Sequence, residues 1–291
     1  MIRLFAILIG LVFSGVALLS FGVGAYTFAT EEHEPTAEHE FHLAPKDVAY
    51  SFDGPFGKWD KVQLQRGYKV YKEVCAACHS LKFVSFRDLA DLGYSEAQVK
   101  ALAAEWQVPG IDPDTGEATL RPGLPTDRFP LVYPNDVAAR AANNNAIPPD
   151  LSLMTKARHD GTNYVHSLLI GYADPATYKN AEGKSLAQEF PEFSTPPGLN
   201  FNPYFANLNL AMAAPIAADG QVTYDDGTTA TVDQMATDVA AFLTWTAEPK
   251  MQQRKQTGTW FILFLLFATT LAYFSYKNIW AGKKPKKGSS E

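Results

Sequence analysis

The sequence predicts a mainly α-helical domain with long loops, joined at its C-terminal end to a transmembrane helix. Apolar residues recur at helical spacing after polar helix-start signals at Asp60, Ser95 and Thr231. The stretches between these helices are rich in proline, glycine and asparagine, which favours loops. With 291 residues, 46% of them hydrophobic, the chain can bury a substantial core.

Residues 1–29 predict a secretory signal peptide or, if they are retained, an uncleaved anchor. The run is almost continuously apolar, and Arg3 is its only charged residue. Small residues near its end, including Gly24 and Ala25, are typical of the region before a cleavage point, so we expect cleavage. Residues 30–50 are polar and acidic and predict a flexible lead-in to the folded domain.

Residues 258–280 predict a transmembrane anchor helix. Trp260 and Trp280 bracket an apolar run of about the length that a bilayer requires, and tryptophans favour the two membrane interfaces. Residues 281–291 form a lysine-rich tail, and basic residues concentrate on the cytoplasmic side of a membrane. We therefore expect a cytoplasmic tail and a domain, residues 51–250, that lies outside the cytoplasm.

Four helices are expected within this domain. The first begins at Asp60 and runs to the two cysteines, and the second begins at Ser95 and ends before Pro109. The other expected elements are a short helix at 163–172, a helix from Thr231 to Pro249, a small hairpin at 221–228, and long loops at 110–149 and 174–209.

The only two cysteines of the chain lie in the sequence Cys75-Ala76-Ala77-Cys78-His79. Two thiols at this spacing can add to the two vinyl groups of one haem, and the histidine that follows is placed as an axial ligand. A zinc site would need a second ligand pair, and a thioredoxin-like redox pair would be expected beside a βαβ pattern. The motif occurs once and predicts one covalently bound haem c.

A haem that only transfers electrons is expected to have a second axial ligand, because an open position would admit oxygen or peroxide. Met235 on an apolar helix face, Met251 beside the membrane, and His166 among leucines are better explained by structural roles. Met212, in a loop of small residues, is favoured, and Met154 remains an alternative. The full set of candidates is Met154, Met212, Met235, Met251, His159 and His166.

The overall charge limits the kind of partner. The formal net charge is −6 at pH 7, which argues against nucleic acid, because phosphate recognition requires a basic face. A basic protein partner fits better, and acidic residues such as Asp112, Asp114 and Glu117 are expected either to steer it electrostatically or to belong to a solvated loop.

Further stretches of the sequence carry a resemblance to a known family. They are Ser51 to Gly57, Gln65 to Tyr68, Cys75 to His79, Arg121-Pro122-Gly123, Tyr133-Pro134-Asn135, Ala138 to Asn144, Pro148 to Ser152, Ala157-Arg158-His159, Tyr164 to Leu169 and Phe242 to Pro249. Together they resemble the cytochrome c1 family, the membrane-anchored haem subunit of the ubiquinol–cytochrome c reductase (cytochrome bc1) complex, in its bacterial form. The resemblance covers most of residues 41–280.

The resemblance implies a class I cytochrome c-like fold for the haem domain and a role for each residue of the site. Cys75 and Cys78 would carry the haem thioethers. His79 and Met212 would be the two axial ligands of the iron. Arg158 would contact a haem propionate, as a guanidinium can do through two parallel hydrogen bonds.

The resemblance also implies partners and a location. Electrons would arrive from a Rieske iron–sulfur protein and leave to cytochrome c, within a dimeric complex that contains cytochrome b. The chain itself would be an electron carrier of this enzyme complex, without a quinol site, in the bacterial inner membrane with its haem domain in the periplasm. The alternatives are a monohaem subunit of a terminal oxidase or nitric oxide reductase, and a haem enzyme or gas sensor with an open sixth position.

Overall fold

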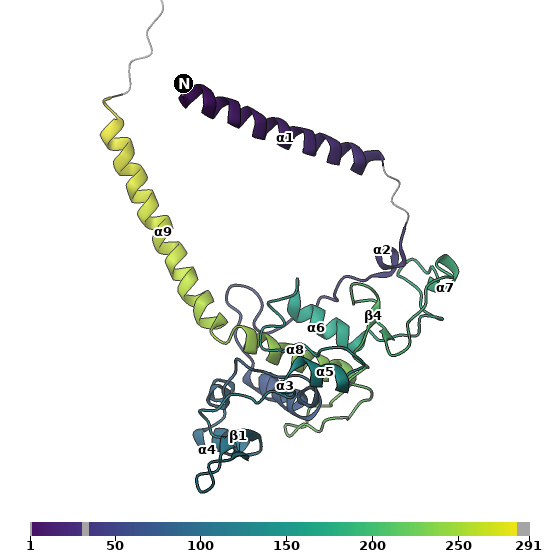
Figure 1. The fold of residues 1–291 in the computed structure, drawn as a ribbon. Helices are drawn as coiled ribbons and strands as arrows, with labels where there is room; N and C mark the ends of the chain where they lie inside the picture. The colour runs from purple at the N-terminus through teal and green to yellow at the C-terminus, as the bar shows by residue number, and fades with distance from the viewer. Residues whose placement is uncertain (1, 31–34, 284–291) are drawn as a thin grey trace, which may run out of the picture. The chain divides into compact units, whose positions relative to one another are not determined.

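The computed structural model describes residues 2–30 and 35–283 of the chain, in two compact units, Met1–Glu40 and Phe41–Glu291 (Figure 1). The first unit contains α1 (Ile2–Thr30), an apolar helix with no buried residue. Its mean hydropathy of 2.6 and its length are sufficient to cross a membrane. A signal peptide and a retained anchor both have these properties.

The larger unit is mainly helical, as predicted, and the three predicted helix starts are confirmed. Asp60 caps α3 (Lys61–Glu73) by accepting the backbone N–H groups of Val62 and Gln63. Ser95 and Gln98 form a capping box at α4 (Glu96–Ala104), and Thr231 caps α8 (Val232–Ala247). The other short helical segments of this unit are η1 (Cys75–Ala77), η2 (Phe86–Leu92), α5 (Asp136–Ala142), α6 (Gly161–Ile170) and α7 (Leu186–Glu189). The short helix α2 (Ala37–Phe41) belongs almost wholly to the first unit.

The core forms where α3 crosses α8. At Gly67 the two backbones approach so closely that an added Cβ would lie 2.1 Å from the Asp238 carbonyl oxygen. Tyr68 and Tyr71 of α3 pack there against Phe242 of α8, with ring centroids 5.7 and 5.8 Å apart. The crossing therefore fixes the end of α3 from which the cysteine motif follows.

Two expected loops contain short strands, so those expectations are wrong in part. Antiparallel β1 (Gln107–Ile111) and β2 (Ala118–Pro122) form a hairpin that overlaps the start of 110–149. β3 (Asn200–Phe201), within 174–209, pairs with β4 (Asn209–Leu210) at the end of that stretch. Proline is tolerated in a two-stranded sheet because both strands have a free edge.

The hairpin expected at 221–228 does not form, and no strand occurs in that stretch of the described chain. The carboxylates of Asp225 and Asp226 instead bind Lys69 and Arg66 of α3. Val222 and Tyr224 are buried. Tertiary contacts with α3 therefore replace the cross-strand pairing that the Asp-Gly signal indicated.

The last part of the lead-in, residues 41–50, is hydrogen-bonded to the folded domain, and the flexibility of residues 30–50 stays a prediction. The backbone N–H of Leu43 donates to the Pro203 carbonyl at 2.8 Å, and that of Lys46 donates to Ser167 Oγ at 2.8 Å. Phe41 is fully buried. Residues 31–34 lie outside the described part of the chain.

Helix α9 (Met251–Trp280) contains the predicted transmembrane segment and begins before the expected residue 258.

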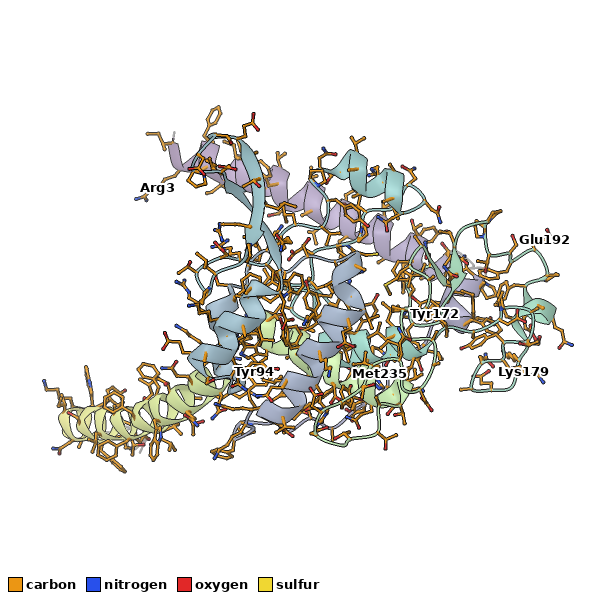
Figure 2. The ribbon with its side chains drawn as sticks, turned by 90° about the horizontal axis from the view of Figure 1, so that it is seen from below. Arg3, Tyr94, Tyr172, Lys179, Glu192 and Met235 are labelled. Carbon is orange, nitrogen blue, oxygen red and sulfur yellow. The ribbon has the colours of Figure 1, made fainter. Side chains whose placement is uncertain are left out.

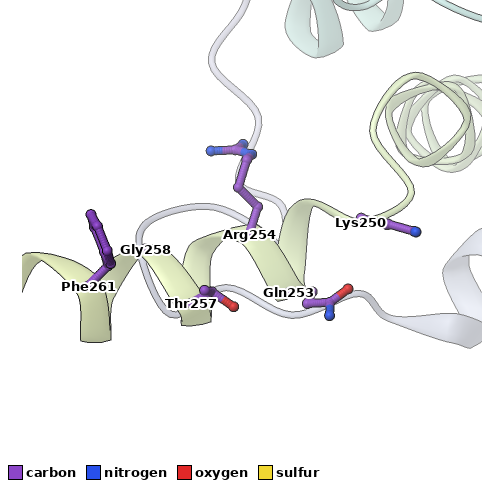
Figure 3. Close-up of a pocket in the computed structure, with 6 residues that line it drawn as sticks. All are labelled: Lys250, Gln253, Arg254, Thr257, Gly258 and Phe261. Atoms are coloured by element: carbon purple, nitrogen blue, oxygen red, sulfur yellow. The ribbon is translucent and has the colours of Figure 1, made fainter.

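Along the first turns of α9 lies a pocket of about 460 Å³ (Figure 3). Gly258 contributes no side chain between Arg254 and Phe261. The residues that line the pocket are Lys250, Gln253, Arg254, Thr257, Gly258 and Phe261. None of them has a thiol, thioether or imidazole group, so this pocket is not a haem site. Residues 284–291 of the predicted tail lie outside the described part of the chain.

Candidate haem site

The cysteine motif folds as a tight turn directly after α3. The backbone N–H groups of Cys78 and His79 both donate to the Cys75 carbonyl, at 3.1 and 2.9 Å. This turn brings the two cysteines and the histidine together at one end of the helix. Cys75 is buried and Cys78 is exposed.

The buried thiol of Cys75 does not have the lowered pKa of a reactive redox thiol. Burial raises the pKa of the Cys75 thiol to about 12. A reactive dithiol needs a lowered thiol pKa, because the thiolate is the nucleophile. The described residues also contain no group of three or more His, Cys, Asp or Glu side chains that could hold a metal ion.

His79 is oriented by a backbone carbonyl that the sequence analysis missed. Its Nδ1 lies 2.7 Å from the Pro149 carbonyl oxygen. Because a carbonyl oxygen only accepts hydrogen bonds, the hydrogen must be on Nδ1. The lone pair of Nε2 is then free to bind an iron ion. Burial lowers the pKa of His79, although the bond to Pro149 opposes this effect, so the neutral imidazole is favoured. This donor set fits a haem iron.

The carbonyl of residue 149 is held in place by a segment that is bonded to the residues after the motif. The backbone N–H of Leu151 donates to the Ser80 carbonyl at 2.9 Å. Asp150 accepts from the backbone N–H groups of Lys82 and Ser152, at 2.8 and 3.0 Å. The sequence signals for this segment were the run Pro148-Pro149-Asp150 within an expected loop and the family resemblance of Pro148 to Ser152.

The backbone of His79 has a second contact, from the core. The Tyr71 hydroxyl donates to the His79 carbonyl at 3.0 Å. Burial raises the pKa of Tyr71, so its hydroxyl keeps the proton that it donates. The histidine is thus held at both its ring and its main chain.

The candidates for a second axial ligand differ in their environment. Met235, labelled in Figure 2, belongs to α8 and is fully buried in the core, and Met251 is also buried. His166 is buried with its Nε2 3.0 Å from Asp233, and His159 is exposed. The two half-buried methionines that pack on the core are Met154 and Met212.

Met212 and Arg158 lie in separate loops. Met212 follows β4, and its carbonyl accepts hydrogen bonds from Tyr172 and Asn200. Arg158 is exposed and forms no ion pair with another residue of the described chain; its Nη1 donates to the neighbouring carbonyl of Ala157. Among the described residues, no hydrogen bond joins Arg158 or Met212 to His79.

Comparison with known proteins gives a consistent family match. The cytochrome c1 family model matches residues 50–283. Cytochrome c1 of Rhodospirillum rubrum is 44% identical over 242 residues, which cover 81% of this chain and 87% of that protein. The mitochondrial cytochrome c1 haem protein of Saccharomyces cerevisiae is 43% identical over 258 residues, covering 89% and 78%. Cytochrome b/c1 of Bradyrhizobium diazoefficiens is 46% identical over 245 residues, covering 81% of this chain and 36% of that longer protein.

Proposed function

We propose that this chain, which belongs to the cytochrome c1 family, is a membrane-anchored electron carrier. Members of this family carry one covalent haem c and are the electron-transfer subunit of the bc1 complex. It takes electrons from a Rieske iron–sulfur protein and passes them to cytochrome c. The observation that carries the proposal is the motif turn, in which the Pro149 carbonyl fixes the tautomer of His79.

Five side chains hold the haem in this proposal. The thiols of Cys75 and Cys78 would form the thioether links, and His79 Nε2 would bind the iron. Met212 would supply the second iron ligand, a thioether, and Arg158 would bind a propionate. The haem supplies a one-electron redox centre, and a thioether opposite imidazole keeps its potential high.

The surroundings of the competing groups support Met212 as the second ligand. The Nε2 of His166 is 3.0 Å from Asp233, and Met235 is enclosed by the core. Met154 shares the half-buried environment of Met212 and is the residue against which the assignment must be tested.

Helix α9 anchors the chain, and α1 acts as a signal peptide that is removed. The haem domain lies in the periplasm and the C-terminus in the cytoplasm. The relative of 46% identity is named cytochrome b/c1, which supports association with a cytochrome b. We place the chain with cytochrome b and the Rieske protein in a dimeric complex. Co-purification of these subunits from membranes, and quinol-dependent reduction of the haem, test this assignment.

The decisive test of the site compares Met212→Leu with Met154→Leu in the full chain. The unchanged protein is expected to have a low-spin, six-coordinate haem that does not bind carbon monoxide at neutral pH. Met212→Leu opens the sixth position, admits carbon monoxide, and lowers the potential by a large part of the ~0.8 V range that axial ligands span. Met154→Leu is the matched control and leaves both properties unchanged.

Two results would contradict the proposal in different ways. Ready carbon monoxide binding by the unchanged protein would indicate an enzyme or gas sensor with an open position. A spectrum altered by Met154→Leu and not by Met212→Leu would keep the electron carrier and move the ligand to Met154.

A further inference from the structure

The main-chain carbonyl of Met212 accepts two side-chain hydrogen bonds from different elements. Tyr172 Oη donates at 3.0 Å, and Asn200 Nδ2 donates at 3.4 Å. The first distance is ordinary for a hydrogen bond, whereas the second is long. Tyr172 is therefore the stronger contact and Asn200 the weaker.

Tyr172 is brought to this position by the end of α6. The residue before it, Gly171, lies so close to its neighbours that an added Cβ would be 2.4 Å from Tyr204 Cδ2 and 2.9 Å from Asn202 Oδ1. Asn202 is fully buried, and its Nδ2 donates to the Leu168 carbonyl at 2.8 Å. The helix end is thereby fixed against the segment that follows β3, with Tyr172 at the start of the loop that carries Lys179 and Glu192 (Figure 2).

Asn200 is held by the β3–β4 ladder, in which it pairs with Leu210. Its Nδ2 also donates to the Leu210 carbonyl at 3.4 Å. The turn between the strands is closed by Leu208, a buried non-glycine residue with a φ of 61°. Such a backbone is uncommon for leucine and persists only where the surrounding structure imposes it.

We propose that Tyr172 and Asn200 are positioning residues that keep the Met212 thioether at the haem iron by holding the Met212 carbonyl. This inference rests on the proposed function, in which Met212 is an axial ligand. The two donors come from the end of α6 and from β3, so displacement of the Met212 main chain must break bonds to both.

The positioning role can be measured as competition between Met212 and an external ligand for the sixth coordination position of the haem iron. An external ligand such as imidazole binds ferric haem only after Met212 has left, so its apparent affinity is proportional to the fraction of molecules with Met212 detached. Loss of one ordinary hydrogen bond, about 1 kcal/mol, raises this fraction about fivefold. Tyr172→Phe is therefore expected to bind imidazole about fivefold more tightly, and Asn200→Ala to bind it more tightly by a smaller factor.

The experiment titrates imidazole into the ferric full-length holoprotein in detergent and follows the haem spectrum. Tyr178→Phe is the matched control, since no hydrogen bond from its hydroxyl occurs among the described contacts and its ring packs on Phe201 with centroids 5.0 Å apart. This control is expected to behave as the unchanged protein. If Tyr172→Phe does not fold, Asn200→Ala decides the question.

The outcomes separate the positioning role from the identity of the ligand. Unchanged imidazole affinity in folded Tyr172→Phe and Asn200→Ala, with strongly raised affinity in Met212→Leu, overturns the positioning role and leaves the ligand in place. Unchanged affinity in Met212→Leu overturns both. Lower stability to urea without a change in imidazole affinity shows a merely structural role, and also overturns the proposal.

Discussion

Substitution of Arg66 by methionine tests how the crossing of α3 and α8 is held together. Arg66 binds the carboxylate of Asp238 through Nε at 2.8 Å and Nη2 at 3.2 Å. The Asp238 side chain is completely buried, whereas that of Arg66 is 15% exposed. Arg66→Met removes this partner, together with the contact of Arg66 Nη1 with Asp226 at 2.7 Å, and leaves the buried Asp238 carboxylate beside the side-chain donor Gln234 Nε2 at 2.9 Å.

The expected cost follows from the burial of Asp238. Breaking a buried ion pair by removing one partner typically costs about 3–5 kcal/mol, because the remaining charge is uncompensated. The bond from Gln234 offsets part of this penalty. We therefore expect the free energy of unfolding to fall by about 3 kcal/mol, at the lower end of that range.

Urea unfolding of the holoprotein, followed by tryptophan fluorescence, measures the change. Lys69→Met is the matched control in the same helix, because its partner Asp225 is 88% exposed. An exposed pair of this kind contributes about 0–1 kcal/mol. The double variant Arg66→Met/Asp238→Leu replaces both charges by apolar groups and is expected to recover most of the lost stability.

Two results would refute this reasoning. A loss in Arg66→Met no larger than that in Lys69→Met would show that Asp238 does not depend on Arg66. A double variant less stable than Arg66→Met would show that packing at Asp238, rather than its charge, controls the crossing.

Two further predictions concern the same packing. Gly67→Ala would place a methyl 2.1 Å from the Asp238 carbonyl oxygen. We therefore expect the free energy of unfolding, measured in urea, to fall by about 2 kcal/mol or more. The control is Gly258→Ala, whose methyl meets nothing within 4 Å, and equal stability of the two variants would contradict the prediction. Burial lowers the pKa of His166 in the folded state, despite the opposing effect of Asp233. As the pH falls, the imidazole is therefore protonated at a higher pH in the unfolded chain than in the folded protein. Stability is therefore expected to fall as the pH drops below about 6.5, the ordinary histidine value. The urea midpoint of His166→Gln should depend less on pH, and an equal dependence would exclude His166 as the cause.

Local signals in the sequence predicted most of the helices and the haem motif. Asp60, Ser95 and Thr231 cap their helices as expected because a cap involves only residues a few positions away. The cysteine spacing was informative for the same reason. Both are short-range patterns, so they do not depend on how the rest of the chain folds.

The contacts that orient the site could not be predicted in this way. The Pro149 carbonyl reaches His79 across 70 residues, and Tyr172 reaches Met212 across 40. Neither contact has a signature in the sequence, because a carbonyl is present at every position. The expected hairpin at 221–228 failed for a related reason, since α3 bound the carboxylates of its turn.

Because the acceptor for His79 is a main-chain oxygen, the substitutions expected to disturb the histidine are not those of the residue that provides this oxygen. Every residue type at position 149 would offer the same oxygen, so the side chain there can be replaced if the path of the chain is kept. The path depends on Asp150, which accepts the N–H groups of Lys82 and Ser152. Variants that impair the histidine are therefore expected at Asp150, a residue that touches neither the ring nor the cysteines through any described hydrogen bond.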